Sequence, residues 1–194
     1  MATGSRPELD IEPSPSFTDE PLYEVIDGQV VEMPPMGSYP VEVASILFEH
    51  LGPFVKKAGL GRGIIEVLFR IDAKTQYRPD LAYISYEKWP KGRRAPKTQP
   101  WEIVPDLAVE VISKNDEAWE VIEKVHRYFQ VGVRGVWLVH PNLEIIHVYE
   151  SFTQIRVLTR DDELDGGAII PGFRLPLTSL FEEETEEQGA NPAP

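Results

Sequence analysis

The order of apolar and polar positions along the chain predicts a β-hairpin and then a helix. Residues 23–26 and 29–33 flank Asp27-Gly28, a pair that supplies the positive φ angles a tight hairpin turn needs. Apolar residues then recur at helical spacing from position 41 to about position 58. Gly52-Pro53 lies inside this stretch, and we expect it to kink or break the helix.

The middle of the chain alternates strand and helix signals. Apolar runs predict strands at residues 64–71 and 81–85, and the strongly apolar run at 107–113 predicts a central strand. Residues 117–130 predict a second helix that ends near Gly132. The buried stripe of this helix is expected to consist of Trp119, Ile122, Val125 and Phe129.

The remaining elements complete a mixed sheet. Further strands are predicted at residues 135–139, 145–149 and 155–159, and residues 171–181 close the domain. The resulting order, β-β-α-β-β-β-α-β-β-β, is not that of a doubly wound array. It indicates an α/β fold of the α+β kind, with a mixed sheet and helices packed on it.

Length and composition indicate one domain with polar ends. The 194 residues favour a single domain, predicted at 21–181. Residues 1–20 are rich in Pro, Ser and acidic side chains and predict a disordered arm, and residues 182–194 predict an acidic, disordered tail. The chain has no cysteine, which excludes disulfides and thiolate metal sites. Without a membrane span or a signal peptide in the sequence, we expect a cytoplasmic protein with no membrane partner.

Charge argues against a nucleic-acid partner but does not exclude one. The net charge is −13; the two ends carry −4 and −5 of it, so residues 21–181 are only mildly acidic. One basic loop, at 86–100, has two aromatic residues nearby, one of which could stack on a base. Its side chains are Lys88, Lys91, Arg93, Arg94 and Lys97, with Trp89 and Trp101 nearby. Phosphate contact and an ordinary solvated loop both remain open, and the second is favoured.

Two carboxylates are the candidate chemistry. Asp80 begins a predicted strand, and Glu110 lies inside the apolar run at 107–113. A carboxylate in such a strand is costly unless it is paired, protonated or bound to a cation. Converging carboxylates from neighbouring strands suit Mg²⁺, which can activate water and stabilise phosphoryl charge. A structural Pro-Asp turn and a buried Glu–Arg pair are the alternatives.

The positions of these carboxylates resemble the PD-(D/E)XK nuclease pattern, and more narrowly the Uma-type restriction endonuclease family. The matching stretches are 23–28, 32–35, 78–81, 105–113, 124–128, 132–133, 137–139 and 171–176. The likeness extends over residues 21–181. It implies a restriction-endonuclease-like core, with a central mixed β-sheet flanked by helices.

The resemblance also implies a hydrolase: an endonuclease that cleaves DNA with Mg²⁺ or Mn²⁺, and a homodimer. Asp80 and Glu110 fall on the acidic metal-binding positions, and the backbone carbonyl of Ile112 would be a further ligand. Ile112 occupies the usual lysine position, so Lys124 on the following helix would supply the catalytic lysine. From the residues alone, Glu120, Lys124 and Tyr128 share a helix face, which favours a solvated Glu–Lys pair beside Tyr128.

Two departures from the family pattern leave a second hypothesis open. Pro40 stands where family members often have His, with Glu42 as a possible substitute, and His140 stands where they often have Asp. His140 and His147 lack further zinc ligands in the sequence and are taken as ordinary strand residues. The rival function is a catalytically silent nuclease-fold binding or structural module; an enzyme acting on another phosphate ester has no specific support. A Glu110–arginine pair, or a solvent-facing Lys124, would favour the silent module.

Overall fold

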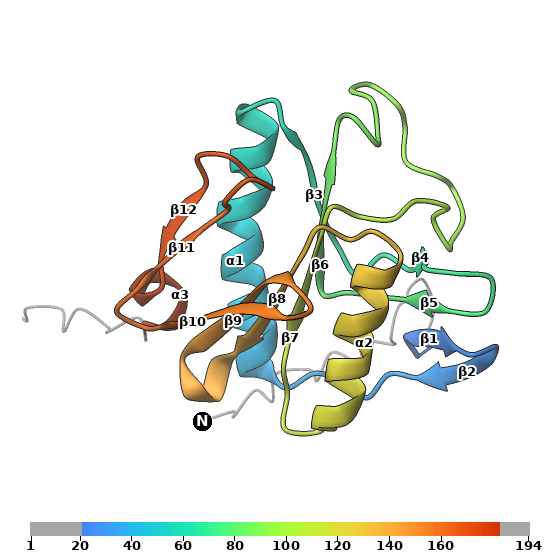
Figure 1. Cartoon of the computed structure of the whole chain (residues 1–194), viewed down its shortest axis with the longest axis horizontal. Helices are drawn as coiled ribbons and strands as arrows, with labels where there is room; N and C mark the ends of the chain where they lie inside the picture. The colour runs from blue at the N-terminus through green and yellow to red at the C-terminus, as the bar shows by residue number, and fades with distance from the viewer. Residues whose placement is uncertain (1–20, 183–194) are drawn as a thin grey trace, which may run out of the picture.

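The computed structural model describes residues 21–182. A six-stranded sheet forms its centre, with helix α1 (Ser38–Lys57) on one face and helix α2 (Ala118–Gln130) on the other (Figure 1). The predicted α+β class with a mixed sheet is confirmed. The predicted arm at 1–20, and the tail beyond Glu182, lie outside the described residues.

The six-stranded sheet has the order β10-β9-β8-β7-β6-β3. Its strands are β3 (Gly61–Ile65), β6 (Leu81–Ser85), β7 (Leu107–Val111), β8 (Gly135–His140), β9 (Ile145–Ser151) and β10 (Gln154–Thr159). β7 and β8 are parallel, and the other neighbours are antiparallel. All residues of β6 and β7 are buried, and β7 lies in the interior of the sheet as its apolar sequence predicts.

Helix α1 runs without interruption through Pro53, so the expected break after Gly52 is wrong. Leu51 and Val55, on either side of this pair, are both completely buried in the core against the sheet. Gly63 of β3 lets the strand lie close to this point of the helix, because a Cβ added at Gly63 would lie 3.0 Å from the Gly52 Cα atom. Packing on the sheet therefore outweighs the local preference for a break.

Helix α2 begins and ends where the sequence predicts, but half of its predicted buried stripe is wrong. Val125 is buried and Phe129 is partly buried, whereas Trp119 and Ile122 are 64% and 42% exposed. The first turn of the helix borders a pocket rather than the sheet, and this removes Trp119 from the core. Gly132 follows the helix with φ +93°, as expected of a helix stop.

A second, four-stranded sheet has the order β2-β1-β5-β4. Its strands are β1 (Tyr23–Ile26), β2 (Gln29–Glu32), β4 (Phe69–Arg70) and β5 (Gln76–Tyr77). The predicted hairpin is confirmed, with φ of +51° at Asp27 and +84° at Gly28. The predicted strand at 64–71 is wrong as one unit. Glu66, with φ +48°, separates β3 from β4, and the two segments belong to different sheets.

The C-terminal segment closes the α1 side of the sheet. It contains β11 (Glu163–Asp165), β12 (Arg174–Pro176) and α3 (Thr178–Phe181), which follow β8, a short 3-10 helix η1 (Pro141–Leu143), β9 and β10. Leu164, Leu175 and Leu180 belong to the same buried cluster as α1. No helix within residues 21–182 is long and apolar enough to cross a membrane.

Candidate active site

A pocket of about 540 Å³ lies at the carboxyl end of β7. Asp80, Glu110 and Lys124 all line it, so the three predicted catalytic residues face one space. The walls are the segment after β7, the first half of α2, and the β1–β2 hairpin with the residues that follow it. The hairpin is tied to α2, because Arg127 Nη1 and Nη2 lie 2.8 and 2.9 Å from the two Asp27 carboxylate oxygens.

Asp80 and Glu110 are brought together by strand pairing. Leu81 of β6 pairs with Val109 of β7 in an antiparallel register. The residue before Leu81 is Asp80 and the residue after Val109 is Glu110, so the register brings these two residues side by side. The Val111 backbone N–H donates to Asp80 Oδ2 at 2.6 Å. This bond fixes the Asp80 carboxylate against the neighbouring strand.

Both carboxylate oxygens of Glu110 have partners from α2. Lys124 Nζ lies 3.0 Å from Oε2, and the Tyr128 hydroxyl donates to Oε1 at 2.7 Å. Lys124 is only 16% exposed, so it does not point to solvent, and Glu110 is paired with a lysine and a tyrosine rather than with an arginine. The solvated Glu120–Lys124 pair that the residues alone favoured is therefore wrong.

Glu24 is a site residue that the sequence did not reveal. Its Oε1 lies 2.8 Å from Lys124 Nζ and also accepts a hydrogen bond of 2.6 Å from the Arg78 backbone N–H. Lys124 thus lies between two buried carboxylates, one from β1 and one from β7. A glutamate in a four-residue hairpin strand gives no sign of which face will be covered. Only the long-range pairing of β1 with β5 determines that Glu24 points inward.

Burial shifts the acid–base behaviour of this cluster. It raises the pKa of Asp80 from 3.8 to about 6, although the Val111 N–H and Lys124 act in the opposite direction. Burial also raises the pKa of Glu110, an effect to which the charges of Asp80 and Glu24 add. Burial lowers the pKa of Lys124, but its carboxylate neighbours outweigh this and the net shift is upward. Lys124 therefore stays charged, while ionisation of Asp80 and Glu110 is costly.

The wider lining of the pocket is acidic and partly apolar. Acidic side chains beyond the central cluster are Asp27, Glu32, Asp116, Glu117, Glu120 and Glu123. Lys124 is the one Lys or Arg among the described residues that line the pocket. A polyanion entering this space would be repelled unless a cation offsets the negative charge.

Ile112, the predicted backbone ligand, also lines the pocket, and its N–H donates to the Val139 carbonyl at 2.8 Å. Pro40 is buried in α1, and Glu42 is exposed; neither lines the pocket. His140 and His147 face each other on β8 and β9, with ring centroids 4.6 Å apart, outside the pocket lining.

The basic loop at 86–100 leaves the end of β6 opposite to Asp80 (Figure 1), and none of its residues lines the pocket. Trp89 and Trp101 are buried and stack on each other at 5.3 Å, and the Arg93 guanidinium lies 4.4 Å from the Trp89 ring centre. Neither ring is available for a base.

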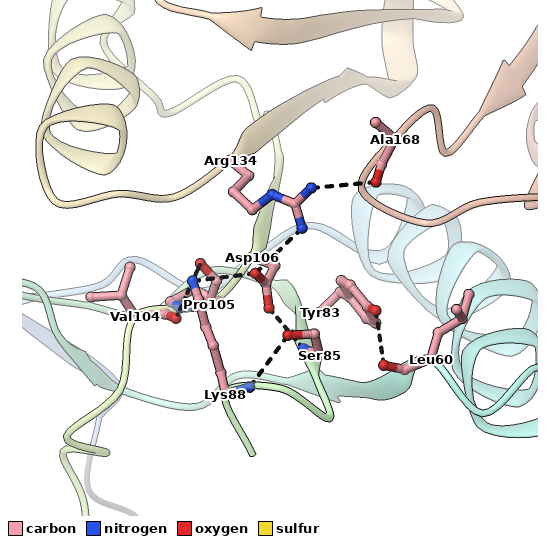
Figure 2. Close-up of polar contacts among 9 residues, drawn as sticks. All are labelled: Leu60, Tyr83, Ser85, Lys88, Val104, Pro105, Asp106, Arg134 and Ala168. Atoms are coloured by element: carbon pink, nitrogen blue, oxygen red, sulfur yellow. Dashed lines mark hydrogen bonds and ion pairs between the residues drawn. The ribbon is translucent and has the colours of Figure 1, made fainter. Parts of the chain in front are cut away.

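A buried aspartate elsewhere in the sheet provides a structural carboxylate for comparison. Asp106, at the opposite end of β7, accepts a 2.7 Å hydrogen bond from the Ser85 N–H and pairs with Lys88 at 3.3 Å and Arg134 at 3.8 Å (Figure 2). Asp106 does not line the pocket. Asp80 differs because it is only partly buried, borders an open space and has a raised pKa.

Comparison with known families agrees with this architecture. The sequence profile of Uma2, described as "Putative restriction endonuclease", matches residues 9–178. The chain belongs to the Uma2 family. The likeness stated from the sequence is thereby confirmed for most of this Uma2 protein. No curated protein sequence matches it.

The fold of this Uma2 protein is similar to that of a crystallised protein from Anabaena variabilis, described as a putative nuclease belonging to DUF820. The TM-score is 0.71 at 19% identity, over 82% of this chain and 89% of that one. The expectation of a restriction-endonuclease-like fold is therefore confirmed.

Proposed function

We propose that the protein is a Mg²⁺- or Mn²⁺-dependent endonuclease that hydrolyses DNA phosphodiester bonds at Asp80, Glu110 and Lys124. The observation that carries the proposal is the placement of a buried carboxylate, a partly buried carboxylate and a charged lysine in a single pocket. Membership of a family described as "Putative restriction endonuclease" supports a nuclease function.

The donor set suits a hard divalent cation. Mg²⁺ takes oxygen ligands, commonly from one or two carboxylates, and keeps several waters. Asp80 and Glu110 would hold it, with the Ile112 carbonyl as a further ligand. No group of three or more His, Cys, Asp or Glu side chains placed to hold a metal occurs in residues 21–182, so water and substrate oxygens would complete the shell. When bound, the ion would activate water and offset phosphoryl charge.

The protein's own residues then have distinct tasks. The Val111 N–H and the Tyr128 hydroxyl orient the Asp80 and Glu110 carboxylates. Lys124 stays protonated and supplies a fixed positive charge that stabilises negative charge developing on the phosphate. Water attacks the phosphorus, so no covalent intermediate with the protein is required.

The rival function, a silent nuclease-fold binding module, is favoured by the acidic pocket and by Pro40 and His140 at variant positions. The burial cost of Asp80 and Glu110 weighs against it. Without a bound metal ion, ionised Asp80 and Glu110 raise the free energy of the folded state.

Cleavage of end-labelled single- and double-stranded DNA in Mg²⁺, Mn²⁺ or EDTA tests the proposal. Wild type should cut only with metal, and Asp80→Asn and Glu110→Gln should abolish cutting while Asp161→Asn, an exposed control, cuts like wild type. No cutting by folded wild type with either metal would contradict the proposal and favour the silent module. Cutting that survives Asp80→Asn would place the chemistry elsewhere.

A further inference from the structure

Trp119 is unusual among the four tryptophans of the chain. Trp89, Trp101 and Trp137 are buried, whereas Trp119 is mostly exposed and lines the pocket. Helical periodicity alone placed it in the core, and the structure places it on the first turn of α2 instead. An exposed indole at the mouth of a pocket is typical of a ligand-binding surface.

The hairpin side of the pocket adds further apolar surface. The side chains that supply it are Val31, Met33, Pro34 and Met36, from β2 and the segment after it. The Glu24–Lys124 and Asp27–Arg127 ion pairs hold this hairpin against α2, so the space between them is fixed. The pocket therefore combines an aromatic and aliphatic rim with the carboxylate–lysine centre.

The volume of the pocket limits what can enter it. About 540 Å³ falls within the range of small-molecule sites and has room for a nucleotide-sized group. The bases of a duplex are stacked and paired, so an enzyme that brings a base into a pocket must take it from a single strand or flip it out. The acidic lining repels phosphates, so an uncharged planar group is the part of a nucleic acid that this rim can attract.

We infer that the pocket receives one unpaired nucleobase, which stacks on Trp119 and places the adjoining phosphate at the Asp80–Glu110 centre. The inference rests on the proposed function and specifies its substrate as single-stranded or locally unpaired DNA. Stacking on an aromatic face tolerates every base, so no strong sequence preference is expected from this contact.

The fluorescence of Trp119 reports whether the pocket is occupied, because the other three tryptophans are buried. Acrylamide should quench Trp119 fluorescence in the free protein, and a 12-nucleotide oligothymidylate with Ca²⁺ should protect it. A blunt duplex of the same length should give little protection. Trp119→Ala should weaken oligothymidylate binding about 5- to 150-fold, the range for one base stacked on an aromatic ring, and Trp119→Phe should recover most of it.

Ile122→Ala is the matched control, since Ile122 is exposed on the same helix but does not line the pocket. Three results would overturn the inference: equal protection by duplex, wild-type affinity in Trp119→Ala, or a Trp119 already shielded in the free protein by another segment or a second copy.

Cleavage is measured separately, so the two proposals can fail independently. Asp80-dependent cutting of duplex that Trp119→Ala does not change would remove the inference and keep the nuclease. Oligothymidylate binding through Trp119 without any cutting would remove the nuclease and keep the base-binding pocket.

Discussion

Lys124 Nζ lies 3.0 Å from Glu110 Oε2, and this ion pair joins α2 to the central strand β7 in a buried position. Glu24 lies 2.8 Å from the same nitrogen, so one cation serves two carboxylates. Buried ion pairs often add nothing to stability compared with well-packed apolar residues. Their presence in the lining of a pocket is better explained by the chemistry of the pocket.

Removing the lysine should destabilise the protein strongly at neutral pH. Lys124→Met leaves Glu24 and Glu110 buried and unpaired, which should lower the free energy of unfolding by about 3–5 kcal/mol. Adding Glu24→Gln should recover part of the loss. Urea unfolding at pH 7 measures both variants beside Lys114→Met, an exposed control. If Lys124→Met is as stable as that control, the two ion pairs do not contribute to the free energy of unfolding.

Removing the Tyr128 hydroxyl should affect both stability and cleavage. Tyr128→Phe leaves Glu110 Oε1 without its 2.7 Å donor, a loss of about 1–3 kcal/mol for a buried acceptor. Cutting should slow because the Glu110 carboxylate is no longer oriented. Tyr149→Phe, in a buried tyrosine of β9 outside the pocket, is the control. If both variants cut at the wild-type rate, Tyr128 does not orient Glu110.

Neutralising Asp80 should stabilise the metal-free protein at high pH. The folded-state pKa of about 6 lies above the ordinary 3.8, so the folded state binds this proton more tightly than the unfolded state. The stability from Asp80 is fully present below pH 3.8 and is lost as pH rises through about 6. Asp80→Asn should therefore gain about 2–3 kcal/mol at pH 8, and little at pH 4.

Urea unfolding in EDTA at pH 4, 6 and 8 measures this difference, again beside Asp161→Asn. A gain that is constant across the three pH values would show that ionisation of Asp80 is not its cause. A less stable Asp80→Asn at pH 8 would show that the carboxylate is not strained by burial.

Asp106 should behave in the opposite way, because its partners match its charge (Figure 2). Asp106→Asn keeps an acceptor for the Ser85 N–H but loses the ion pairs with Lys88 and Arg134. Both cations reach solvent, so the loss should be modest, about 1–3 kcal/mol. Thermal unfolding tests this, and cleavage by the folded variant should equal that of wild type. A loss of cutting would show that Asp106 affects the site at the other end of β7.

Local signals explain which elements the sequence predicts correctly. Asp27-Gly28 specifies its own turn, and the apolar run that contains Glu110 needs burial on both faces, so the hairpin and β7 follow from short segments. The end of β3 at Glu66 does not, because nothing in the local sequence marks a residue with φ +48°. The exposure of Trp119 depends on which turns of α2 pack on the sheet, and helical periodicity does not predict this.

The candidate site was predictable in part for the same reason. Glu110 stands out because carboxylates are rare in buried strands, whereas Asp80 and Lys124 follow mainly from the family resemblance. Glu24 is invisible in the sequence, since its burial arises from the pairing of Val25 with Gln76, fifty-one positions away. The predicted homodimer remains a prediction.

The central claim is that Asp80 and Glu110 act together as one divalent cation site, and calorimetric titration of Mn²⁺ into the folded protein tests it most directly. We predict one site per chain in wild type and in Asp161→Asn, with binding lost in Asp80→Asn and in Glu110→Gln. Undetectable Mn²⁺ binding to wild type, or wild-type binding by either pocket variant, would contradict the claim.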